Sequence, residues 1–530
     1  MRRWNGWGDD AESFHLPETA APFLDAAVGT SKPPRDATLT EICLVVPASR
    51  LPPHSHVSTE ASDRVRHARG QSLPDWVAVR SGRIDTFPDG VAHPSSAAEV
   101  RELMAWAGEV GARVIPYGGG TSVVGHVNPL ASDEPVLTLD LGALDALLSF
   151  DEKSQLATFG AGVRGPVLES RLNEKGYTLG HFPQSFELST LGGWIATRSS
   201  GQQSIRYGRI EQLFAGGRME SPAGELELPC FPASAAGPDL RELVLGSEGR
   251  LGILTEATVR VARQPEKEDF HAIFFPGWEE GLEATRRLAQ AGLPLAMLRL
   301  STAEETATNL AMAGHQRLLS ALEKGLSVFG AGERKCMLVV GFAGRSRMVD
   351  AARKEALSIA KDEGGLHVGK TFGAQWHKNR FKAPYLRNEL WERGYAVDTF
   401  ETALTWTKVP AYVAAITAAI RDGLADEGER VHVFTHLSHL YPTGSSAYTT
   451  YLFRLDKDPE VTLRRWRRLK EAASKTIVER GGTISHQHGI GVDHKEYLEA
   501  EKGPLGMQAL GEACRLFDPA GILNPGKLID

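Results

Sequence analysis

The feature that most constrains the fold is a run of three glycines at residues 118–120, within the segment PYGGGTSVVGH. The run follows the apolar, strand-like sequence ARVIP and precedes a segment that has no helical period. Adjacent glycines let backbone N–H groups converge on an anion without interference from Cβ atoms. The segment lacks the Lys-Ser/Thr of a Walker loop, and no helix opens after it as a dinucleotide loop requires. Taken alone, it is either a tight turn or a cradle for a phosphate.

Two further segments rich in Gly, Ser and Thr lie in the same region: PQSFELSTLGGWIATRSSG at residues 183–201 and GSEGRLGIL at residues 246–254. A chain that needs only turns scatters its glycines singly. Three clusters in one region of mixed helices and strands therefore suggest one extended polar ligand, lined by backbone amides and hydroxyl groups. That ligand would be longer than a single phosphate.

A G-x-G-x-x-G motif also occurs, at residues 160–165, between a strand-like run and a helical segment. This motif is typical of a Rossmann dinucleotide site, in which the glycines open the helix that meets the pyrophosphate. Here Pro166 follows the third glycine, and the cluster at 118–120 competes for the same ligand. A Rossmann NAD site is therefore kept only as an alternative.

The chain is long enough, at 530 residues, for two or three domains with large cores. Residues 1–80, with one strand-like run, EICLVVP, predict an N-terminal arm with little core of its own. Residues 81–263 mix helices and strands and carry the glycine clusters. Residues 264–470 alternate strands such as CMLVVGFAG with helices such as GLEATRRLAQAG, which predicts an α+β substrate cap. Residues 471–530 predict a C-terminal segment that packs where the two domains meet.

Local patterns place several elements within residues 81–263. Ser96 and Glu99 are spaced as a capping box before the helix AEVRELMAWAGEVG. A further helix is predicted at PVLESRLNEKG. Strands are predicted at ARVIP, PVLTLDL, QLATFGAG and ILTEATVRVA.

Composition and charge argue against several classes of protein. The formal charge of −7 gives no reason to expect nucleic acid as a partner. Four widely separated cysteines form no C-x-x-C pair, so neither a disulfide framework nor a cysteine metal site is indicated. The N-terminus lacks the apolar core of a signal peptide, and no apolar run reaches the length of a membrane span. We therefore expect a cytoplasmic protein.

The basic segment at residues 463–480 has two interpretations. Five of its first eight residues are Arg or Lys, and Leu463, Trp466 and Leu469 recur at helical spacing. Such a helix could contact an anionic membrane surface, or it could be a solvated face whose long side chains cover apolar surface. Membrane association therefore stays open.

Four histidines form two pairs, His436 with His439 in THLSH and His486 with His488 in SHQHGIG. Together they could bind a metal through imidazole nitrogens. No Asp, Glu or Cys lies close in sequence to either pair as a further ligand, so we predict acid–base or hydrogen-bonding roles and no metal.

Cations occur in apolar surroundings at Arg299, Arg380, Lys382 and Arg387. A single arginine of this kind usually pairs with a carboxylate, but several in one domain fit an anionic substrate that guanidinium groups grip through paired hydrogen bonds. Tyr448, in the alternating run SSAYTTYLF, is either a cross-strand packing residue or a functional one.

The glycine clusters, in this order and spacing, are similar to the PCMH-type FAD-binding domain of the vanillyl-alcohol oxidase family. More narrowly, RWNGWGDD, MLRL, YLRNELWERGYAVDTFETALTW, YPTGSSAYTTYLF and SHQHGIG resemble the alkylglycerone-phosphate (alkyldihydroxyacetonephosphate) synthases over nearly the whole chain. The resemblance implies an α+β fold, in which a two-subdomain PCMH-type FAD-binding domain is joined to an α+β cap domain.

The resemblance also implies which residues hold FAD. They are Tyr117, Gly118, Gly119, Gly120, Thr121, Ser122, Val123, Gln184, Ser185, Phe186, Glu187, Leu188, Ser189, Thr190, Thr197, Arg198, Ser199, Ser200, Glu248, Gly249, Arg250, Leu251, Gly252, Ile253 and Leu254. Some relatives attach FAD covalently through a histidine in the glycine loop. Gly and Thr take that place here, so we expect FAD to be non-covalent.

The resemblance implies a reaction of ether-lipid synthesis, in which a fatty alcohol replaces the acyl chain of acyl-dihydroxyacetone phosphate through a flavin N5 adduct. Tyr448 would be the acid or base, and His486 and His488 would tune it and meet the flavin. Arg387 would grip the substrate phosphate, and Arg299 would line the active site. A free tyrosine has a pKa of about 10, so it needs such neighbours to act near neutrality.

Two departures from the family pattern bear on this interpretation. The resembling eukaryotic enzymes carry three successive histidines where this chain has His486, Gln487 and His488, and a glutamine cannot shuttle a proton. Gln184 stands where an acidic residue is common. The alternative function is an FAD-linked dehydrogenase or oxidase of a 2-hydroxy acid, for which the THLSH pair would serve a metal. The partner we expect is a small lipid substrate with a phosphate, with a peripheral membrane contact and a homodimer left open.

Overall fold

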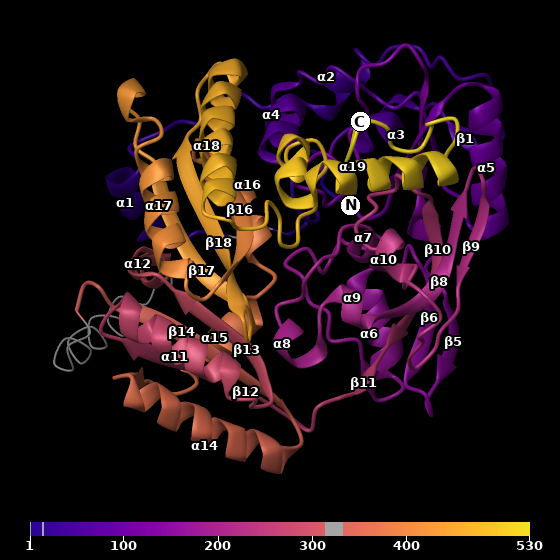
Figure 1. The fold of residues 1–530 in the computed structure, drawn as a ribbon. Helices are drawn as coiled ribbons and strands as arrows, with labels where there is room; N and C mark the ends of the chain where they lie inside the picture. The colour runs from indigo at the N-terminus through magenta and orange to yellow at the C-terminus, as the bar shows by residue number, and fades with distance from the viewer. Residues whose placement is uncertain (1, 13–14, 313–331) are drawn as a thin grey trace.

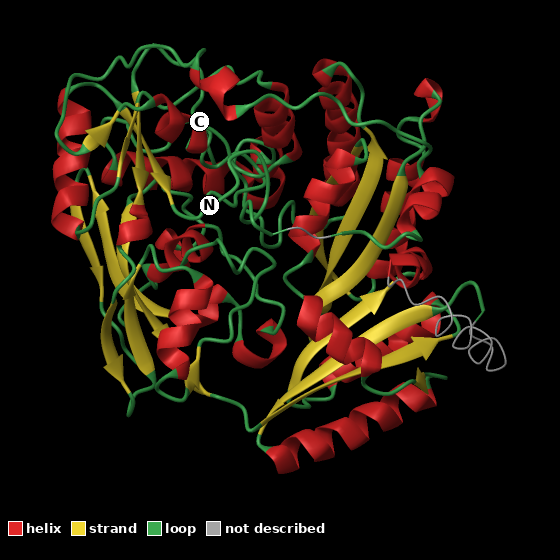
Figure 2. Cartoon of the chain, turned by 180° about the vertical axis from the view of Figure 1, so that it is seen from behind, coloured by secondary structure: helices red, strands yellow, loops and turns green. Residues whose placement is uncertain are grey.

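The computed structural model describes residues 2–12, 15–312 and 332–530. Two α/β bodies lie side by side, one formed mainly by residues up to 263 and the other mainly by the following 200 residues (Figure 1). Seen from behind, loops fill the region between the sheets of the two bodies (Figure 2). The mixed helix and sheet architecture agrees with the α+β prediction.

The first body has two main sheets among the described residues. In the four-stranded sheet, of order β1-β2-β4-β3, the three longer strands are parallel. The five-stranded sheet, of order β5-β6-β10-β8-β9, is antiparallel. The strands are β1 (Val57–Ser58), β2 (Gly90–Ala92), β3 (Arg113–Tyr117), β4 (Val136–Asp140), β5 (Leu147–Asp151), β6 (Leu156–Gly160), β8 (Phe214–Ser221), β9 (Gly224–Leu228) and β10 (Ile253–Arg260).

Helix α5 (Ala97–Glu109) covers the parallel sheet with one apolar face. Val100, Leu103, Met104 and Ala107 recur at helical spacing and are buried against strands β3 and β4. Ser96 caps the helix by accepting from the Glu99 backbone at 3.2 Å, but the Glu99 carboxylate accepts from the backbone of Ser95 instead of closing the predicted box. The remaining helices of this body are α6 (Gly165–Asn173), α7 (Leu191–Ala196), α8 (Ser204–Tyr207), α9 (Ile210–Leu213) and α10 (Arg241–Val244).

The cap is built on one antiparallel sheet, with the order β15-β12-β14-β13-β17-β18-β16 in the described part of the chain. Its strands are β12 (Lys267–Phe275), β13 (Leu295–Ser301), β14 (Cys336–Gly344), β15 (Leu366–His367), β16 (Tyr395–Thr405), β17 (His432–Tyr441) and β18 (Gly444–Arg454). A short pair, β7 (Tyr177–Thr178) and β11 (Ala262–Arg263), lies where the chain passes from the first body to the cap. The cap helices are α11 (Trp278–Gln290), α12 (Ala303–Met312), α14 (Ser346–Asp362), α15 (Thr371–Asn379), α16 (Ala383–Glu392), α17 (Val409–Arg421) and α18 (Pro459–Glu479).

The predicted strand EICLVVP in the N-terminal arm is wrong. Its first residues end helix α2 (Leu39–Cys43), which Thr38 and Glu41 begin with a capping box. The Leu44 and Val45 side chains that suggested a strand are 81% and 63% exposed. No strand in the described part of the chain pairs with this run, so no sheet stabilises it in an extended form. The capping box therefore decides the local structure.

The N-terminal arm packs on the cap as well as on the first body. Its other helices are α1 (Ala20–Ala27), α3 (Ala61–Arg66) and α4 (Leu73–Ser81). Leu24 of α1 is buried with Leu390 and Leu452 of the cap. Trp7 and Trp76 join the main core of the cap. The arm therefore closes one side of the space between the two bodies.

The C-terminal tail joins the parallel sheet. After helix α19 (Leu498–Phe517), the backbone at Asn524 donates to the carbonyl of Val114 at 2.8 Å, and Val114 donates to Ile522 at 2.8 Å. The turn before α19, at residues 485–491, contacts Glu401 of the cap and Glu248 of the first body. The C-terminal segment therefore contacts both bodies.

Helix α18 carries the basic segment that could have contacted a membrane. Its apolar side chains face the core, with Trp466 8% and Leu469 0% exposed. Arg465 pairs with Glu427 at 3.0 Å, and Arg468 pairs with Asp426 at 2.7 Å. The apolar face of this helix is therefore not available to a bilayer. In the described part of the chain, no helix combines the length and apolar character needed to cross a membrane.

Candidate active site

A cavity of about 460 Å³ lies between the first body and the cap. The glycine-rich segments form one wall, and strands β16, β17 and β18 with helices α12 and α16 form the other. Most of the predicted cofactor residues line it: Tyr117, Gly118, Gly119, Gly120, Thr121, Ser122, Val123, Gln184, Ser185, Ser189, Thr190, Thr197, Ser199, Ser200, Glu248, Gly249, Gly252, Ile253 and Leu254. The three sequence clusters therefore meet around one space.

The glycine loop presses against the second cluster. A Cβ on Gly118 would lie 2.4 Å from Thr190 Oγ1, and a Cβ on Gly119 would lie 2.0 Å from the carbonyl oxygen of Leu188. Gly120 has φ +61°, and a Cβ there would lie 2.0 Å from the hydroxyl of Tyr117. These glycines are thus required by close packing between two chain segments, in addition to any close approach to a ligand.

Six predicted cofactor residues do not line the cavity. The Phe186 ring stacks on Phe381, Glu187 accepts from the Tyr385 hydroxyl at 2.7 Å, and Leu188 packs on the cap core. The remaining three contact protein groups at the rear of the wall. Arg198 pairs with Glu242, Arg250 donates to the Leu523 carbonyl, and Leu251 is buried.

Several hydroxyl groups of the second cluster are held by protein partners. Ser189 Oγ accepts from the indole N–H of Trp194 at 2.7 Å, and Ser199 Oγ lies 2.7 Å from the His181 ring. Thr190 Oγ1 accepts from the backbone of Gly193 at the start of α7. Thr197 Oγ1 likewise donates to the carbonyl of Gly193 at 2.9 Å. These groups shape the wall, which leaves Thr121 as the hydroxyl group better placed to meet a ligand.

His126 and Glu248 connect the glycine clusters through a contact that no sequence motif predicts. His126 Nδ1 lies 2.8 Å from Ser122 Oγ, and His126 Nε2 lies 3.1 Å from the Glu248 carboxylate. Glu248 also accepts from the backbone of Ile490 at 2.6 Å and of Gly491 at 2.8 Å. The glycine loop, the third cluster and the C-terminal turn are therefore fixed to one another.

The glycines of the G-x-G-x-x-G motif at residues 160–165 do not line the cavity. A Cβ on Gly160 would lie 2.3 Å from the carbonyl of Leu144, and one on Gly162 would lie 1.8 Å from the carbonyl of Leu141. These glycines allow backbone segments of the protein to pack closely. Backbone packing explains the motif, and the Rossmann alternative loses its support.

On the cap side, three neighbouring strands place Glu401, Tyr448 and His436 in one row. Tyr448 of β18 is the register partner of Glu401 on β16 and of His436 on β17. Cross-strand partners project to the same face of a sheet. The Tyr448 hydroxyl donates to Thr399 Oγ1 at 3.0 Å, and burial raises the pKa of Tyr448 to about 12. Its ring stacks on His436, with centroids 5.1 Å apart, and meets the edge of His488 at 5.7 Å.

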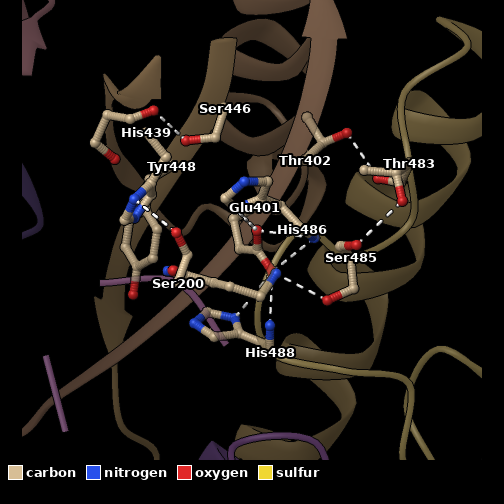
Figure 3. A network of polar contacts seen from close by, with 12 residues as sticks. Ser200, Glu401, Thr402, His439, Ser446, Tyr448, Thr483, Ser485, His486 and His488 are labelled. Carbon is tan, nitrogen blue, oxygen red and sulfur yellow. Dashed lines mark hydrogen bonds and ion pairs between the residues drawn. The ribbon is translucent and has the colours of Figure 1, made fainter. Parts of the chain in front are cut away.

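Glu401 holds the turn that carries His486, Gln487 and His488 (Figure 3). Its carboxylate accepts from the backbone N–H groups of these three residues at 2.9 to 3.0 Å and from Ser485 Oγ at 3.0 Å. Burial raises the pKa of Glu401, but the nearby imidazoles and the backbone donors outweigh it and hold the pKa well below its ordinary value. A single buried carboxylate therefore shapes the whole turn.

The two histidines of the turn have different surroundings. His488 lines the cavity beside Tyr448, whereas His486 lies behind the wall with Nε2 2.6 Å from the Tyr441 hydroxyl. Burial lowers the pKa of both imidazoles, against the opposing effect of Glu401. Gln487 lines the cavity between them.

The two predicted arginines lie in the cavity wall with different partners. Arg387 donates from Nη1 to the Gln71 carbonyl at 2.6 Å and lies over the Trp76 ring, while its Nη2 has no hydrogen-bond partner among the described residues. Arg299 pairs with Glu305 at 2.5 Å, and Glu305 also contacts His436 Nδ1 at 3.1 Å. Arg387 is therefore the better placed of the two to hold an anion.

The other cations of the NRFKAPYLRN segment do not join this site. Arg380 lies over the rings of Phe381 and Phe182, and Lys382 lies over the ring of Tyr385. Asn388 was not predicted as a site residue. Its side-chain amide accepts from the backbone N–H of Trp7 and donates to the carbonyl of Trp7. This contact places the N-terminal RWNGWGDD segment in the cavity wall next to Arg387.

The part of the cavity beyond Arg387 and Tyr448 is mainly apolar. It runs between the cap sheet, the N-terminal helix α1 and the cap helices α12 and α16. Its apolar side chains are Phe23, Leu24, Met312, Leu386, Leu390, Val397, Phe434 and Leu452. The site thus joins a polar, glycine-lined region, one unpaired guanidinium nitrogen and an apolar channel.

Comparison with known proteins agrees with this arrangement. Residues 88–227 match the family model described as an FAD binding domain, and residues 264–528 match the C-terminal domain of FAD linked oxidases. The alkyldihydroxyacetonephosphate synthase of Trypanosoma brucei brucei is 30% identical over 89% of this chain and 78% of its own length. The chain belongs to the alkyldihydroxyacetonephosphate synthase family.

Two further relatives of this synthase family match over almost the whole chain. The alkyldihydroxyacetonephosphate synthase of Dictyostelium discoideum is 28% identical over 99% of this chain and 93% of its own length. A solved alkyldihydroxyacetonephosphate synthase structure has a TM-score of 0.86 at 26% identity, and the match covers 99% of this chain and 98% of that one. The predicted family, fold class and FAD cofactor are confirmed, and the protein is an FAD-dependent enzyme of this synthase family.

The residues of the cavity fit FAD as the cofactor. The glycine loop can bring backbone N–H groups to a pyrophosphate, as Gly118, Gly119 and Gly120 carry no Cβ that would separate them from it. Thr121 adds a hydroxyl group, and Ile253 and Leu254 add apolar surface for a ring system. The cavity wall therefore offers both polar and apolar surface, as a cofactor with a pyrophosphate and a ring system needs.

Proposed function

We propose that the enzyme exchanges the acyl chain of an acyl-dihydroxyacetone phosphate for a fatty alcohol, forming an ether lipid precursor. The observation that carries this proposal is the place of Arg387. Arg387, whose Nη2 has no hydrogen-bond partner among the described residues, lines a cavity that combines a cofactor region with an apolar channel. A guanidinium binds phosphate oxygens through directed hydrogen bonds, and the channel suits a long hydrocarbon chain.

Arg387 would bind the substrate phosphate and so fix the position of the carbon that exchanges its chain. Trp76 and the Gln71 carbonyl hold the guanidinium on one side, which leaves its other edge for the phosphate. The substrate chain would then extend along Phe434 and Leu452. This orientation brings the dihydroxyacetone unit to Tyr448.

Tyr448 would remove a proton from the substrate carbon and later return it. The overall reaction then balances without net oxidation: the bond from carbon to the carboxylate oxygen breaks, a bond from carbon to the alcohol oxygen forms, and the alcohol proton leaves with the fatty acid. Bound FAD would supply a nucleophilic ring nitrogen that holds the substrate carbon while the two chains exchange. His488, next to Tyr448, would tune the phenol, and Arg299 with Glu305 would set the charge of the opposite wall.

We infer that FAD is held without a covalent bond. Gly and Thr occupy the place of a flavin-binding histidine, and His126, at the end of the same segment, has its ring nitrogens 2.8 Å from Ser122 Oγ and 3.1 Å from the Glu248 carboxylate. Neither nitrogen is then free to bond a flavin methyl group.

The exchange reaction can be measured directly with palmitoyl-dihydroxyacetone phosphate and labelled hexadecanol. We expect label to enter the phosphate-bearing lipid, and we expect Tyr448→Phe to reduce the rate at least 100-fold, in line with the loss of a general acid–base group. Tyr412→Phe is a matched control, because Tyr412 is also buried but does not line the cavity. Exchange by Tyr448→Phe at the wild-type rate would reject the assigned role, and no exchange by FAD-loaded wild type would reject the function.

The alternative, oxidation of a 2-hydroxy acid, receives less support from the site. The histidine pair that would serve a metal is engaged elsewhere, because His436 contacts Glu305 and His439 lies 3.0 Å from Ser200 Oγ. Among the described residues, no group of three or more His, Cys, Asp or Glu side chains is arranged to hold a metal ion. Anaerobic mixing with D-lactate or glycolate separates the two functions, since bleaching of the flavin absorbance would favour the oxidoreductase.

A further inference from the structure

A second, smaller cavity of about 30 Å³ adjoins the active site. We call it the polar chamber. It shares Arg299, Tyr448 and Gln487 with the main cavity and is closed by Gln202 and His439, among others. Gln202 and the side chain of Gln487 take no part in the exchange reaction proposed for the site.

Two carbonyl oxygens in the wall of the chamber have no hydrogen-bond donor among the described residues, Oε1 of Gln202 and Oε1 of Gln487. The orientation of the Gln202 amide is fixed, because its Nε2 donates to the Arg380 carbonyl at 3.1 Å. Buried amide oxygens are almost always paired, and leaving one unpaired costs a lost hydrogen bond. These two oxygens would therefore be satisfied by a small hydrogen-bond donor in the chamber.

The backbone next to the chamber is shaped to place a side chain there. The pairing of β17 with β18 is irregular between Ser438 and Leu440, and the intervening His439 has φ +48°. A bulge of this kind re-aims a side chain, and a residue other than glycine rarely adopts a positive φ unless the surroundings impose it. Here the ring of His439 is held by the Ser200 and Ser204 hydroxyls at 3.0 and 3.2 Å.

We propose that the polar chamber binds water, and that Gln487 and Gln202 hold this water against the hydroxyl of Tyr448. One water needs roughly 10–15 Å³ of such space, so the chamber accommodates one or two molecules and is too small for a dihydroxyacetone unit or a carbon chain. Two waters there can together donate to both amide oxygens and to the Tyr448 oxygen, and one of them can accept from the guanidinium of Arg299. Gln487 is then a positioning residue.

This inference rests on the proposed role of Tyr448 and deepens it. Burial raises the pKa of Tyr448 to about 12, which opposes loss of its proton. A hydrogen bond from water to the tyrosine oxygen stabilises the charged form and lowers that pKa. Gln487 and water would supply that hydrogen bond in this chain.

The first test is a crystal structure of the FAD-loaded protein at a resolution where ordered waters are visible. We expect density in the chamber within hydrogen-bond distance of Gln202 Oε1 and Gln487 Oε1, and loss of that density in Gln487→Leu. A chamber without density, in a map that shows other buried waters, overturns the proposal. This result does not depend on the substrate, so it stands apart from any failure of the proposed function.

The second test compares rates in three variants with intact FAD binding. Gln487→Leu should lower kcat about 3- to 10-fold with little change in KM, the size expected for one hydrogen bond lost from the transition state. Gln487→His should retain most of the rate while displacing the water. Equal rates in Gln487→Leu and Gln487→His would contradict the role of the water.

The matched control is the neighbouring glutamine, Gln203. Like Gln202, it is buried, donates through Nε2 to one protein group and leaves Oε1 without a donor in the described structure, but it does not line the chamber. Gln202→Met should change the solvent isotope effect on kcat, and Gln203→Met should not. The same isotope effect in both variants would assign the change to packing and overturn the proposal.

Discussion

Glu401 and Tyr448 are direct cross-strand partners on β16 and β18, so the carboxylate that holds the 485–488 turn adjoins the residue we assign to proton transfer. His488 reaches Tyr448 only because Glu401 binds its backbone N–H group. The distance in sequence is large, 85 residues between Glu401 and His486. The two strands and the turn therefore form one unit, and the position of His488 depends on a residue that contacts no substrate.

Replacing Glu401 by glutamine tests this dependence. The amide keeps one acceptor oxygen but loses the charge, so several N–H groups bond more weakly. We expect the free energy of unfolding to fall by about 1–3 kcal/mol, and kcat to fall with it. Chemical denaturation of the FAD-loaded protein measures the first and the exchange assay the second. Glu479→Gln, at the exposed end of α18, is the control that should change neither.

The effect of Glu401 should depend on pH in a defined direction. Because its pKa is lower in the folded protein than in the unfolded chain, its charge stabilises the fold above about pH 4.3, the ordinary pKa of glutamate. That contribution is lost as the pH falls through the lower, folded value. The stability difference between wild type and Glu401→Gln should therefore be constant from pH 7 to about pH 5 and shrink below pH 4.3. A difference that grows on acidification would contradict the assigned charge.

Arg387→Lys tests the phosphate site. A lysine keeps the charge but offers a point donor in place of a planar fork, and its ammonium cannot reproduce both the bond to Gln71 and a paired contact with phosphate. We expect kcat/KM for the phosphate-bearing substrate to fall about 10- to 100-fold, as for loss of one charge-assisted hydrogen bond. FAD content should stay unchanged.

The control for this variant is Arg380→Lys. Arg380 belongs to the same segment but packs on Phe182 and Phe381 outside the cavity, so kinetics should change little. An equal loss in both variants would indicate a general effect on the cap and count against a phosphate site at Arg387.

The cofactor wall was predictable from sequence because its signal is local. Gly118, Gly119 and Gly120 form a continuous motif, and strands such as β14 carry their pattern in consecutive residues. The supporting residues were not predictable in this way. Glu401 and His126 lie within segments that carry a motif, but no local pattern pairs Glu401 with the 485–488 turn or His126 with Glu248, because these partners are far away in the chain.

Local composition misled one sequence prediction and left another open, and both outcomes have the same physical origin. EICLVVP has the composition of a strand, but the Thr38–Glu41 capping box begins a helix there and the apolar residues that follow stay exposed. Helix α18 has the composition of a membrane-surface helix, but acidic residues of the cap pair with its arginines. In both cases contacts outside the pattern decided the outcome.

Gly119→Ala tests the close approach of the glycine loop to the second cluster. The added Cβ would lie 2.0 Å from the backbone carbonyl of Leu188, and a backbone atom cannot move aside as a side chain can. We expect a loss of about 1–3 kcal/mol in the free energy of unfolding, together with reduced FAD content after purification. Absorbance at the flavin band relative to protein measures the second effect.

Gly108→Ala is the control for this substitution. Gly108 lies in helix α5, has no atom within 4 Å of an added Cβ and does not have a positive φ. Alanine there should stabilise the protein by about 0.5–1 kcal/mol because it lowers the entropy of the unfolded chain and favours the helix. Normal FAD content in Gly119→Ala would show that the loop does not depend on this contact.

Acid precipitation tests how FAD is held. Ser122 faces Nδ1 of His126 and the Glu248 carboxylate faces Nε2, so we expect no covalent bond between this ring and the flavin. All flavin should then appear in the supernatant and none in the precipitate. The stripped protein should unfold at a lower temperature and regain its stability when FAD is added, by about 2.7 kcal/mol at a free FAD concentration 100 times the Kd. Flavin absorbance that stays with the precipitated protein would contradict non-covalent binding, and a His126→Ala variant would then show whether His126 is the point of attachment.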